Sequence, residues 1–409
     1  MKNFFLHSSK TLAILNRGRW TLLLVPACLI VLVSGCASLR PHPATSGKEP
    51  GRTTAISPML AAQVDLDYVY DADSRQQEKN QRLLVQRMCT LGLNTVLLQA
   101  FADPDGNDGA EELYFPNHAL PMRRDLFAGT AALLQQCGLK VYAWLPMLAF
   151  APGPGKEDLL VRTTKPTTPS IRRLSPFNPR AKAIIRGIYE DLARSAPLDG
   201  ILFHDDAMLS DFEDASPAAL AAYEKAGFPA DISRIRQNSA LMARWSRFKT
   251  KALITLSRSL LDIVRRYHPQ AKSGRDLYAR TILQPASEQW FAQSLPLFLQ
   301  AYDYTFVLAM PFMENAPQPD QWLKELADKA LAATVDPASL VFELQTVDWR
   351  RRQKITTAKT MSQLQLLRKG GIDSFAYYPD DFLQNHPRAK SLQQFFARIP
   401  GNRWRCRRD

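Results

Sequence analysis

Short apolar runs alternate with amphipathic stretches from about residue 61 to residue 397, and glycine, proline, asparagine or aspartate marks many of the joints. Apolar runs bounded in this way are typical of buried strands, and apolar residues at helical spacing are typical of helices packed on one face. The pattern predicts strands over 62–70, 94–100, 140–145, 200–203, 271–276, 304–310, 340–345 and 374–378. It predicts helices over 74–91, 180–196, 217–227, 240–267, 290–299, 320–333, 357–369 and 389–397, and another that ends at 137–138.

Three joints share one design, in which a glycine ends a helix and an apolar residue starts the next strand. They are Leu-Gly-Leu-Asn at 91–94, Cys-Gly-Leu-Lys at 137–140 and Gly-Gly-Ile-Asp at 370–373. Strands that alternate with helices form a parallel sheet, and eight such units fit a (β/α)8 TIM-like barrel, an α/β fold. A doubly wound open sheet is the alternative, but no glycine-rich phosphate loop follows the first strand to support it.

The N-terminus has the pattern of an export signal over residues 1–35. Basic residues come first, an apolar core covers 22–33, and small residues follow. The end of this segment, Val-Ser-Gly-Cys at 33–36, resembles the lipobox of bacterial lipoproteins, which implies lipidation of Cys36. Because the next residue, Ala37, is not an acid, the resemblance implies a lipid-anchored protein on the periplasmic face of the outer membrane. An ordinary transmembrane helix is the alternative, and the apolar core is short for one.

Composition and charge narrow the classes of partner and cofactor. The chain is 46% hydrophobic and 22% charged with a formal charge of +13, yet it contains no nucleic-acid-binding motif, so no nucleic acid partner is expected. None of the five cysteines lies in a zinc motif, so we expect neither a metal nor a cofactor. We interpret Cys89 and Cys137 as buried apolar groups, with a disulfide between them as the alternative. The predicted organisation is a flexible tether over 36–58, a barrel domain over 59–400 and a basic tail over 401–409.

The stretch after the fourth predicted strand carries the strongest chemical signal. The apolar run ends in His204, Asp205 and Asp206, and we assign the further carboxylates up to residue 214 to a solvated loop and to helix capping. Carboxylates are costly to desolvate, and barrel enzymes place functional groups where strands end. One aspartate that caps the next helix is the simpler reading. We favour acid/base chemistry, with Asp205 and Asp206 as candidate catalytic residues and His204 as a group that orients one of them.

The ends of the other predicted strands are rich in carboxylates and aromatic rings. Aromatic faces stack on sugar rings and carboxylates bind hydroxyls and amines, whereas a phosphate site would need glycine, lysine and helix N-termini. The candidate substrate-binding residues are Asp67, Tyr68, Trp144, His204, Asp276, Glu314, Glu343, Trp349, Tyr378 and Asp380. Rim packing is the alternative for the aromatic residues. Glu314 and Glu343 are also candidates for a second catalytic or amine-binding carboxylate. The chain has no Gly-x-Ser-x-Gly nucleophile elbow, which argues against a serine hydrolase.

The stretch Gly-Ile-Leu-Phe-His-Asp-Asp-Ala at 200–207, followed by Ser-Asp-Phe-Glu-Asp at 210–214, resembles the C-terminal glycoside-hydrolase-like domain of the PgaB family. Supporting motifs lie at 65–70, 142–146, 173–177, 235–238, 309–311 and 377–380. The resemblance implies a barrel that binds and cleaves partially deacetylated poly-β-1,6-N-acetyl-D-glucosamine, a biofilm polysaccharide, with the acidic pair at Asp205 and Asp206. Full-length members also carry a metal-dependent deacetylase domain. Here the signal and tether lead directly into the barrel, so deacetylation is not expected.

The hypothesis for the reaction is hydrolysis of a β-1,6 bond within the polymer. One of Asp205 and Asp206 protonates the leaving oxygen, and the other steadies charge or the substrate acetamide. A substrate-assisted route and a two-carboxylate route, with Glu314 or Glu343 opposite, both stay open. The alternative function is a non-catalytic polysaccharide-binding lipoprotein that guides polymer to an outer-membrane exporter. A hydrolase of peptidoglycan or another glycan is a third possibility.

Overall fold

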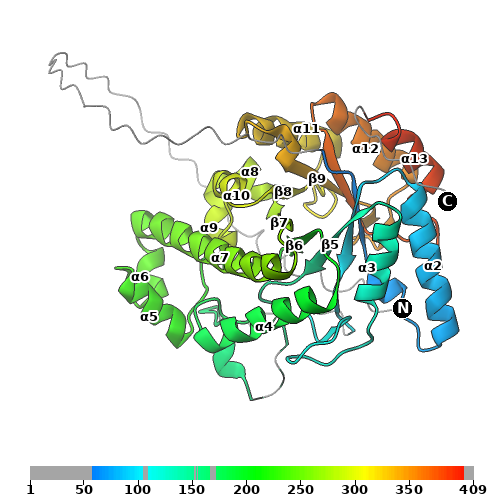
Figure 1. Cartoon of the computed structure of the whole chain (residues 1–409). Helices are drawn as coiled ribbons and strands as arrows, with labels where there is room; N and C mark the ends of the chain where they lie inside the picture. Colours follow the sequence, from blue (N-terminus) through cyan, green and yellow to red (C-terminus); the bar gives the residue numbers. More distant parts are fainter. Residues whose placement is uncertain (1–57, 105–108, 152, 154, 166–171, 400–409) are drawn as a thin grey trace, which may run out of the picture.

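The computed structural model describes residues 58–104, 109–151, 153, 155–165 and 172–399 (Figure 1). Its centre is a sheet of eight parallel strands in the order β1-β2-β5-β6-β7-β8-β9-β12. These strands are β1 (Ala61–Val64), β2 (Thr95–Gln99), β5 (Lys140–Leu145), β6 (Gly200–Phe203), β7 (Lys272–Tyr278), β8 (Tyr304–Leu308), β9 (Leu340–Gln345) and β12 (Ser374–Tyr378). Nearly every residue in them is buried, as expected when helices cover the outside of a parallel sheet.

The first and last strands meet, so the sheet closes on itself. Leu60, just before β1, forms a parallel bridge with Phe375 of β12. The amide of Phe375 donates to the carbonyl of Met59 (2.7 Å), and the amide of Asp380 donates to the carbonyl of Gln63 (3.1 Å). Closure leaves no edge strand between β1 and β12, which confirms the (β/α)8 barrel and rules out the doubly wound open sheet.

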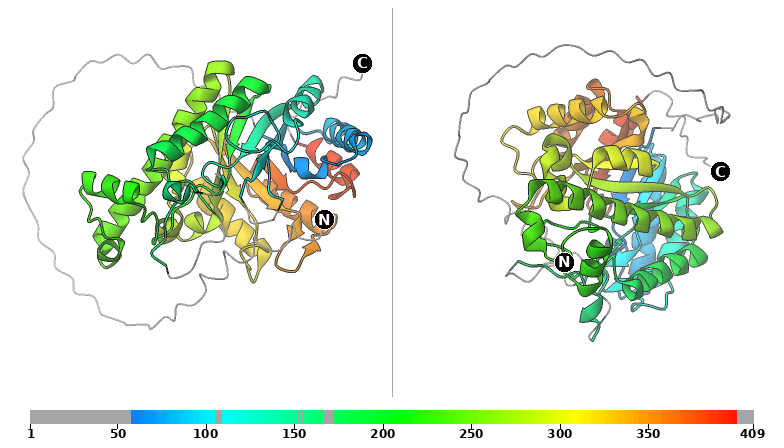
Figure 2. Two further views of the ribbon diagram at one scale, coloured as in Figure 1. Left: turned by 90° about the horizontal axis from the view of Figure 1, so that it is seen from below. Right: turned by 90° about the vertical axis from the view of Figure 1, so that its left-hand side faces the viewer.

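Helices surround the barrel, and one of them carries a small lobe (Figures 1 and 2). The longer ones are α2 (Ser74–Thr90), α3 (Phe127–Gln136), α4 (Pro179–Ser195), α7 (Ser239–Tyr267), α11 (Pro319–Ala332), α12 (Thr357–Lys369) and α13 (Ala389–Phe396). Two further helices, α5 (Pro217–Lys225) and α6 (Ile232–Arg236), stand off to one side with the start of α7 (Figure 2). This lobe has its own apolar cluster around Tyr223 and Trp245, separate from the main core.

The shorter elements lie mostly in the loops between barrel strands and helices. Two small antiparallel pairs are β3 (Phe101–Ala102) with β4 (Glu112–Leu113), and β10 (Val347–Asp348) with β11 (Gln353–Lys354). After β7 come three short helices, α8 (Ala279–Leu283), α9 (Glu288–Phe291) and α10 (Leu295–Ala301). These insertions lengthen the loops of the barrel beyond those of a minimal one.

Two of the predicted elements differ from the structure for local reasons. The predicted strand over 62–70 ends at Val64, because residues 66–68 turn into a 3-10 helix in which the amide of Val69 donates to the carbonyl of Leu66 (2.9 Å). The single predicted helix over 290–299 is the pair α9 and α10. Ala292 between them is left-handed (φ 50°), and Pro296 lies in the first turn of α10, where proline favours a new helix start.

Tight packing at the fourth and fifth barrel strands requires glycine. A side-chain carbon built at Gly200 of β6 would lie 2.4 Å from the ring of Tyr142 on β5. One at Gly274 of β7 would lie 2.6 Å from the ring of Phe306 on β8. Each glycine therefore makes room for a large aromatic ring on the neighbouring strand, so that the barrel is filled by side chains.

A disulfide joins the first two helices of the ring. Cys89 at the end of α2 is bonded to Cys137, the residue after α3. The interpretation of these cysteines as separate buried apolar groups is therefore wrong, and the alternative is correct. The bond links two neighbouring helix C-termini, which also pack against each other through their apolar faces.

Several predictions concern segments outside the described residues. The signal at 1–35, Cys36 with its lipidation, most of the tether at 36–58 and the tail at 401–409 all fall there. In the part of the chain that the structure describes, every helix is too short or too polar to cross a membrane.

Removing the disulfide is expected to destabilise the barrel. The bond closes a loop with a sequence separation of 48, which corresponds to at most about 4 kcal/mol of unfolding free energy. We expect the double variant Cys89→Ser/Cys137→Ser to lose about 2–4 kcal/mol in urea denaturation. A reductant should lower the wild type to the same value and leave the variant unchanged. An equal response of both proteins to the reductant would contradict a stabilising role for this bond.

Candidate active site

Three buried cations hold the loop that follows β6. The guanidinium of Arg275, on β7, donates to the main-chain carbonyls of residues 203 (3.2 Å), 204 and 207 (2.6 Å). Arg173 donates to the carbonyl of residue 208 and forms an ion pair with Glu213 (2.9 Å). The ammonium of Lys249, on α7, donates to the carbonyls of residues 209 (3.4 Å), 210 and 213 (2.9 Å). Glu213, expected in a solvated loop, is therefore buried and paired.

Asp205 is presented at the mouth of the barrel by this loop. Its side chain is 27% exposed. One carboxylate oxygen accepts a hydrogen bond from the hydroxyl of Tyr278 at 2.6 Å, and the other lies 3.2 Å from Nε2 of His204. His204 is itself 19% exposed. Asp205 is thus reachable from solvent, with a hydroxyl donor on one oxygen and the imidazole of His204 beside the other, which suits a group that exchanges a proton with a substrate.

Asp206 faces the opposite way and binds main chain. Its side chain is 1% exposed. One oxygen accepts from the amide of Met147 (2.9 Å), and the other accepts from the amides of Leu148 (2.6 Å) and Ala149 (2.7 Å). These three amides belong to the loop after β5. The two predicted catalytic aspartates are therefore not equivalent, because the carboxylate of Asp206 is fully engaged in holding a neighbouring loop.

Two more carboxyl groups lie buried beside Asp205. Burial and the negative charge of Asp205 raise the pKa of Glu343, on β9, to about 8. Burial, followed by the charges of Glu343 and Asp205, raises the pKa of Asp276, on β7, well above its usual value. Within the described residues, one oxygen of each group has no hydrogen-bond partner. The structure thus brings three predicted site residues into one electrostatic group, in which burial favours the protonated form of the two buried members.

Four of the predicted binding residues form an aromatic wall next to Asp205. The ring centroid of Trp144 lies 5.2 Å from that of His204 and 5.3 Å from that of Tyr378, and Phe101 closes the far side at 5.1 Å. Trp349 lies against Tyr378 with centroids 6.0 Å apart. Trp144 is buried by these neighbours, while Tyr378 and Trp349 keep partial exposure.

Asp67 and Tyr68 lie at the end of β1 in a second polar group. The hydroxyl of Tyr114 donates to Asp67 at 2.5 Å and the side-chain amide of Gln99 donates at 3.0 Å, while burial raises the pKa of the Asp67 carboxyl. Tyr68 meets the ring of Phe382 edge-on at 6.4 Å. The hydroxyl of Tyr378 donates to a neighbouring carboxylate, Asp65 (3.3 Å), and so connects this group to the aromatic wall.

Glu314 and Asp380 have different surroundings. Glu314 follows β8 on a half-buried loop, and burial raises the pKa of its carboxyl. Asp380 is fully buried, and its carboxylate accepts hydrogen bonds from the guanidinium of Arg87 (2.8 Å) and the hydroxyl of Tyr377 (2.8 Å). This ion pair ties α2 to the end of β12 and leaves the carboxylate of Asp380 without solvent exposure, so the structure does not bring it together with Asp205.

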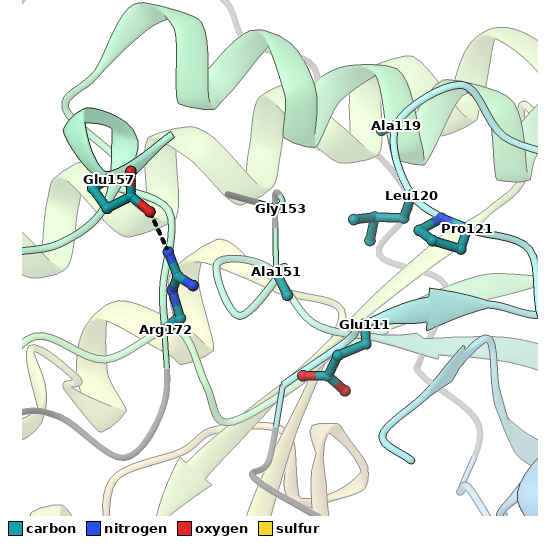
Figure 3. A pocket seen from close by; sticks show the side chains of 8 residues that line it. All are labelled: Glu111, Ala119, Leu120, Pro121, Ala151, Gly153, Glu157 and Arg172. Carbon is teal, nitrogen blue, oxygen red and sulfur yellow. Dashed lines mark hydrogen bonds and ion pairs between the residues drawn. The ribbon is translucent and has the colours of Figure 1, made fainter. Parts of the chain in front are cut away.

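A cavity of about 420 Å³ lies beside the loops that follow β2 and β5 (Figure 3). Its walls include Glu111, the ion pair of Glu157 with Arg172, and an apolar edge at Leu120 and Pro121. None of the predicted site residues lines it. In the described residues no cluster of His, Cys, Asp or Glu is arranged to hold a metal ion.

Some residues of this site were not among the candidate binding residues. The sequence places Arg275 and Tyr278 at the end of the fifth barrel strand, where functional groups gather, but only Asp276 of that strand end is a predicted binding residue. Lys249 is not marked by a strand end, because it lies in the middle of α7. The loop carbonyls that it binds are 36 to 40 residues away in the sequence. Long-range partners of this kind cannot be read from a local pattern.

Asp206→Asn should destabilise the protein more than Asp205→Asn. An asparagine has only one carbonyl oxygen for three amide donors, and its own NH2 group would face them. We expect a loss of about 2–3 kcal/mol of unfolding free energy, the usual range for hydrogen bonds to a charged group. Asp205→Asn, at a more exposed carboxylate, is the matched control with a smaller expected loss. Equal unfolding free energies of the two variants would contradict the division of roles.

Glu343→Gln should flatten the dependence of stability on pH. Since the pKa of Glu343 is raised to about 8 in the folded state, the stability it contributes is full below its unfolded pKa and is lost as the pH rises through 8. We expect the wild type to lose about 1–4 kcal/mol between pH 5 and pH 9 from this group, and the variant to be spared that loss. Glu325→Gln on the surface of α11 is the control. A wild-type decline that the variant fully retains would disprove the assignment.

Comparison with known proteins identifies the family. Residues 63–378 match the model described as hypothetical glycosyl hydrolase family 13, GHL13. The poly-beta-1,6-N-acetyl-D-glucosamine N-deacetylase of Escherichia coli K12 is 39% identical over 353 residues, which cover 83% of this chain and 52% of the relative. The chain therefore spans about half the length of the curated relatives it matches.

Solved structures agree with the family assignment. The PgaB (BpsB) glycoside hydrolase domain from Bordetella bronchiseptica is 45% identical, with a TM-score of 0.79 over 82% of this chain and 98% of that chain. Alpha-L-fucosidase isoenzyme 2 from Paenibacillus thiaminolyticus, 12% identical with a TM-score of 0.55 over 86% of this chain and 51% of that one, shares the fold alone. The resemblance to the PgaB hydrolase domain is confirmed, and the chain belongs to the GHL13 family of glycosyl hydrolases.

Proposed function

We propose that the protein hydrolyses β-1,6 bonds within partially deacetylated poly-N-acetyl-D-glucosamine. The observation that carries the proposal is the placement of Asp205, which is partly exposed at the barrel mouth between Tyr278 and His204, with buried carboxyl groups beside it. The polymer itself is suggested by the relatives, since the curated ones are named for poly-beta-1,6-N-acetyl-D-glucosamine and the solved one is a PgaB glycoside hydrolase domain.

The chemistry needs a proton for the leaving oxygen and stabilisation of the positive charge that develops at the sugar C1. Asp205 is the group that protonates the leaving oxygen, since it is the more exposed of the two adjacent aspartates. Asp206 acts indirectly, by fixing the loop after β5. Glu343 is the second carboxyl group in a two-carboxylate route. In a substrate-assisted route the N-acetyl group of the sugar takes that part.

Preference for a deacetylated polymer follows from the charge of the strand ends. Glucosamine carries an ammonium group, which Asp205 can approach because its carboxylate is partly exposed, with Glu343 and Asp276 buried beside it. Asp67 and Glu314 provide further carboxyl groups at other strand ends. Although the chain has a formal charge of +13, the carboxyl groups at the barrel mouth favour a cationic sugar locally.

We also propose that the protein works in the periplasm, lipid-anchored to the outer membrane through Cys36, near an exporter of the polymer. The disulfide between Cys89 and Cys137 supports an oxidising compartment, where such bonds form and persist. The lipobox-like sequence at 33–36 supports the anchor. Deacetylase activity is no part of the proposed function. A radiolabelled fatty acid that fails to enter the protein in cells, or enters a Cys36→Ala variant equally, would contradict the anchor.

The decisive experiment is incubation of the purified protein with partially deacetylated polymer, followed by sizing of the products. We expect shorter oligomers from the wild type. Asp205→Asn should slow cutting by at least about 100-fold, the scale of a lost general acid, and leave polymer binding within a few-fold. Asp211→Asn is the matched control, because Asp211 lies on the same loop but pairs with Arg236 on the surface (3.0 Å).

Each other outcome has a defined meaning. Binding without cutting by the wild type would refute the hydrolase and favour a polysaccharide-binding protein. Cutting of peptidoglycan or fully acetylated polymer in preference to the deacetylated form would refute the proposed substrate. Undiminished cutting by Asp205→Asn would show that another residue is the general acid.

A further inference from the structure

We propose that Tyr278 is a positioning residue for Asp205, and that its hydroxyl fixes the carboxylate and stabilises its negative charge during turnover. The inference rests on the proposed function of Asp205 and adds a residue and a role to it. Tyr278 is the last residue of β7, so the barrel itself sets the direction from which it approaches.

The contact has the geometry of a strong hydrogen bond. The Tyr278 hydroxyl lies 2.6 Å from a carboxylate oxygen of Asp205, within the range of bonds between a hydroxyl and an ionised oxygen. The other oxygen of Asp205 faces Nε2 of His204. A carboxylate with one oxygen bound to the Tyr278 hydroxyl and the other against the His204 ring has one preferred orientation, so the oxygen that meets the substrate does not have to be ordered in each turnover.

Tyr278 is itself held in place on three sides. Its ring stacks on Phe291 with centroids 4.9 Å apart and planes 27° apart. Its amide donates to the side-chain oxygen of Gln293 (2.9 Å), and its carbonyl accepts from the hydroxyl of Thr281 (2.8 Å). The carbonyl of Phe291 also accepts from the amide of Leu209, in the loop after β6 (3.2 Å). The segment around α9 therefore braces both the tyrosine and the loop that carries Asp205.

The charge around Asp205 explains why a donor is needed there. Its titratable and charged neighbours are His204 and Asp206 on its own loop, Arg275, Asp276 and Tyr278 on β7, and Glu343 on β9. Carboxyl groups outnumber the cations in this set of neighbours. Arg275 donates its hydrogen bonds to main-chain carbonyls, not to Asp205. When Asp205 gives its proton to the leaving oxygen, negative charge appears on it. A hydroxyl already aimed at that oxygen stabilises the charge with no reorganisation.

The test is the variant Tyr278→Phe in the full chain, which removes one oxygen and keeps the ring on Phe291. With partially deacetylated polymer as substrate, we expect kcat to fall about 10- to 100-fold and KM to stay within about twofold. The limb of the pH profile that reports Asp205 should move to higher pH, because the charged form has lost a donor. A purely structural role would lower thermal stability without moving that limb.

Tyr267→Phe is the matched control. Tyr267 ends α7 on the outer surface, and its hydroxyl donates to Glu190 at 3.0 Å. The Tyr267→Phe variant loses the same hydroxyl oxygen and the same kind of hydrogen bond, but away from Asp205. Its kcat and pH profile should therefore match the wild type. Gln293→Ala is a second test in case Tyr278→Phe does not fold. It removes the acceptor of the Tyr278 amide but keeps the tyrosine hydroxyl, and it should reduce kcat by a smaller factor.

A second readout does not depend on catalysis. Carbon-13 label in the aspartate carboxyl groups, with Asp205→Asn to assign the signal, follows the titration of Asp205 by nuclear magnetic resonance. We expect that titration to move to higher pH in Tyr278→Phe and to stay in place in Tyr267→Phe. An unmoved titration overturns the inference whether or not the wild type cuts polymer. Failure of the wild type to cut, with the titration moved, overturns only the proposed function.

Discussion

Three buried cations donate hydrogen bonds to main-chain carbonyls along residues 203–213, and the site depends on that arrangement. Arg275, Arg173 and Lys249 arrive from three separate parts of the chain. A buried cation is costly unless polar atoms surround it, and burial lowers the pKa of Lys249 to about 7. The carbonyls of the loop supply those polar atoms. The cations in turn fix the backbone of a segment that has no regular secondary structure. The directions of its side chains are therefore fixed as well.

Asp206 applies the same principle with the opposite charge. Its carboxylate gathers three amides of the loop after β5, while the cations gather carbonyls of the loop after β6. The two loops are thereby fixed relative to each other at the mouth of the barrel. Asp205, between them, binds no main chain in the described residues, and Tyr278 and His204 lie beside its oxygens. The division of labour within an adjacent pair explains how one aspartate can face solvent while its neighbour is buried.

The fold was predictable because its signals are local. The strands over 340–345 and 374–378 and the helix over 357–369 coincide with β9, β12 and α12, since each is marked by its own apolar pattern and its own boundary residues. The site was predictable only to the level of strand ends. Asp205, Asp206 and Asp380 look alike in sequence, and what separates them is partners 57 to 293 residues away. From the sequence, the disulfide is only an alternative for the same reason, because pairing depends on how two helices meet.

The buried carboxyl groups give the site a reason to distinguish charged from neutral sugars. Burial, together with the charge of Asp205, raises the pKa of both Glu343 and Asp276 and so favours their protonated forms. An ammonium group brought in by a glucosamine unit would favour the ionised forms instead, so protons would leave as the cation binds. An acetylated unit is neutral and offers no such exchange. If the polymer is the substrate, burial makes these carboxyl groups costly to ionise. A cationic sugar would stabilise the ionised form and a neutral sugar would not, so the site would select glucosamine units over acetylated ones.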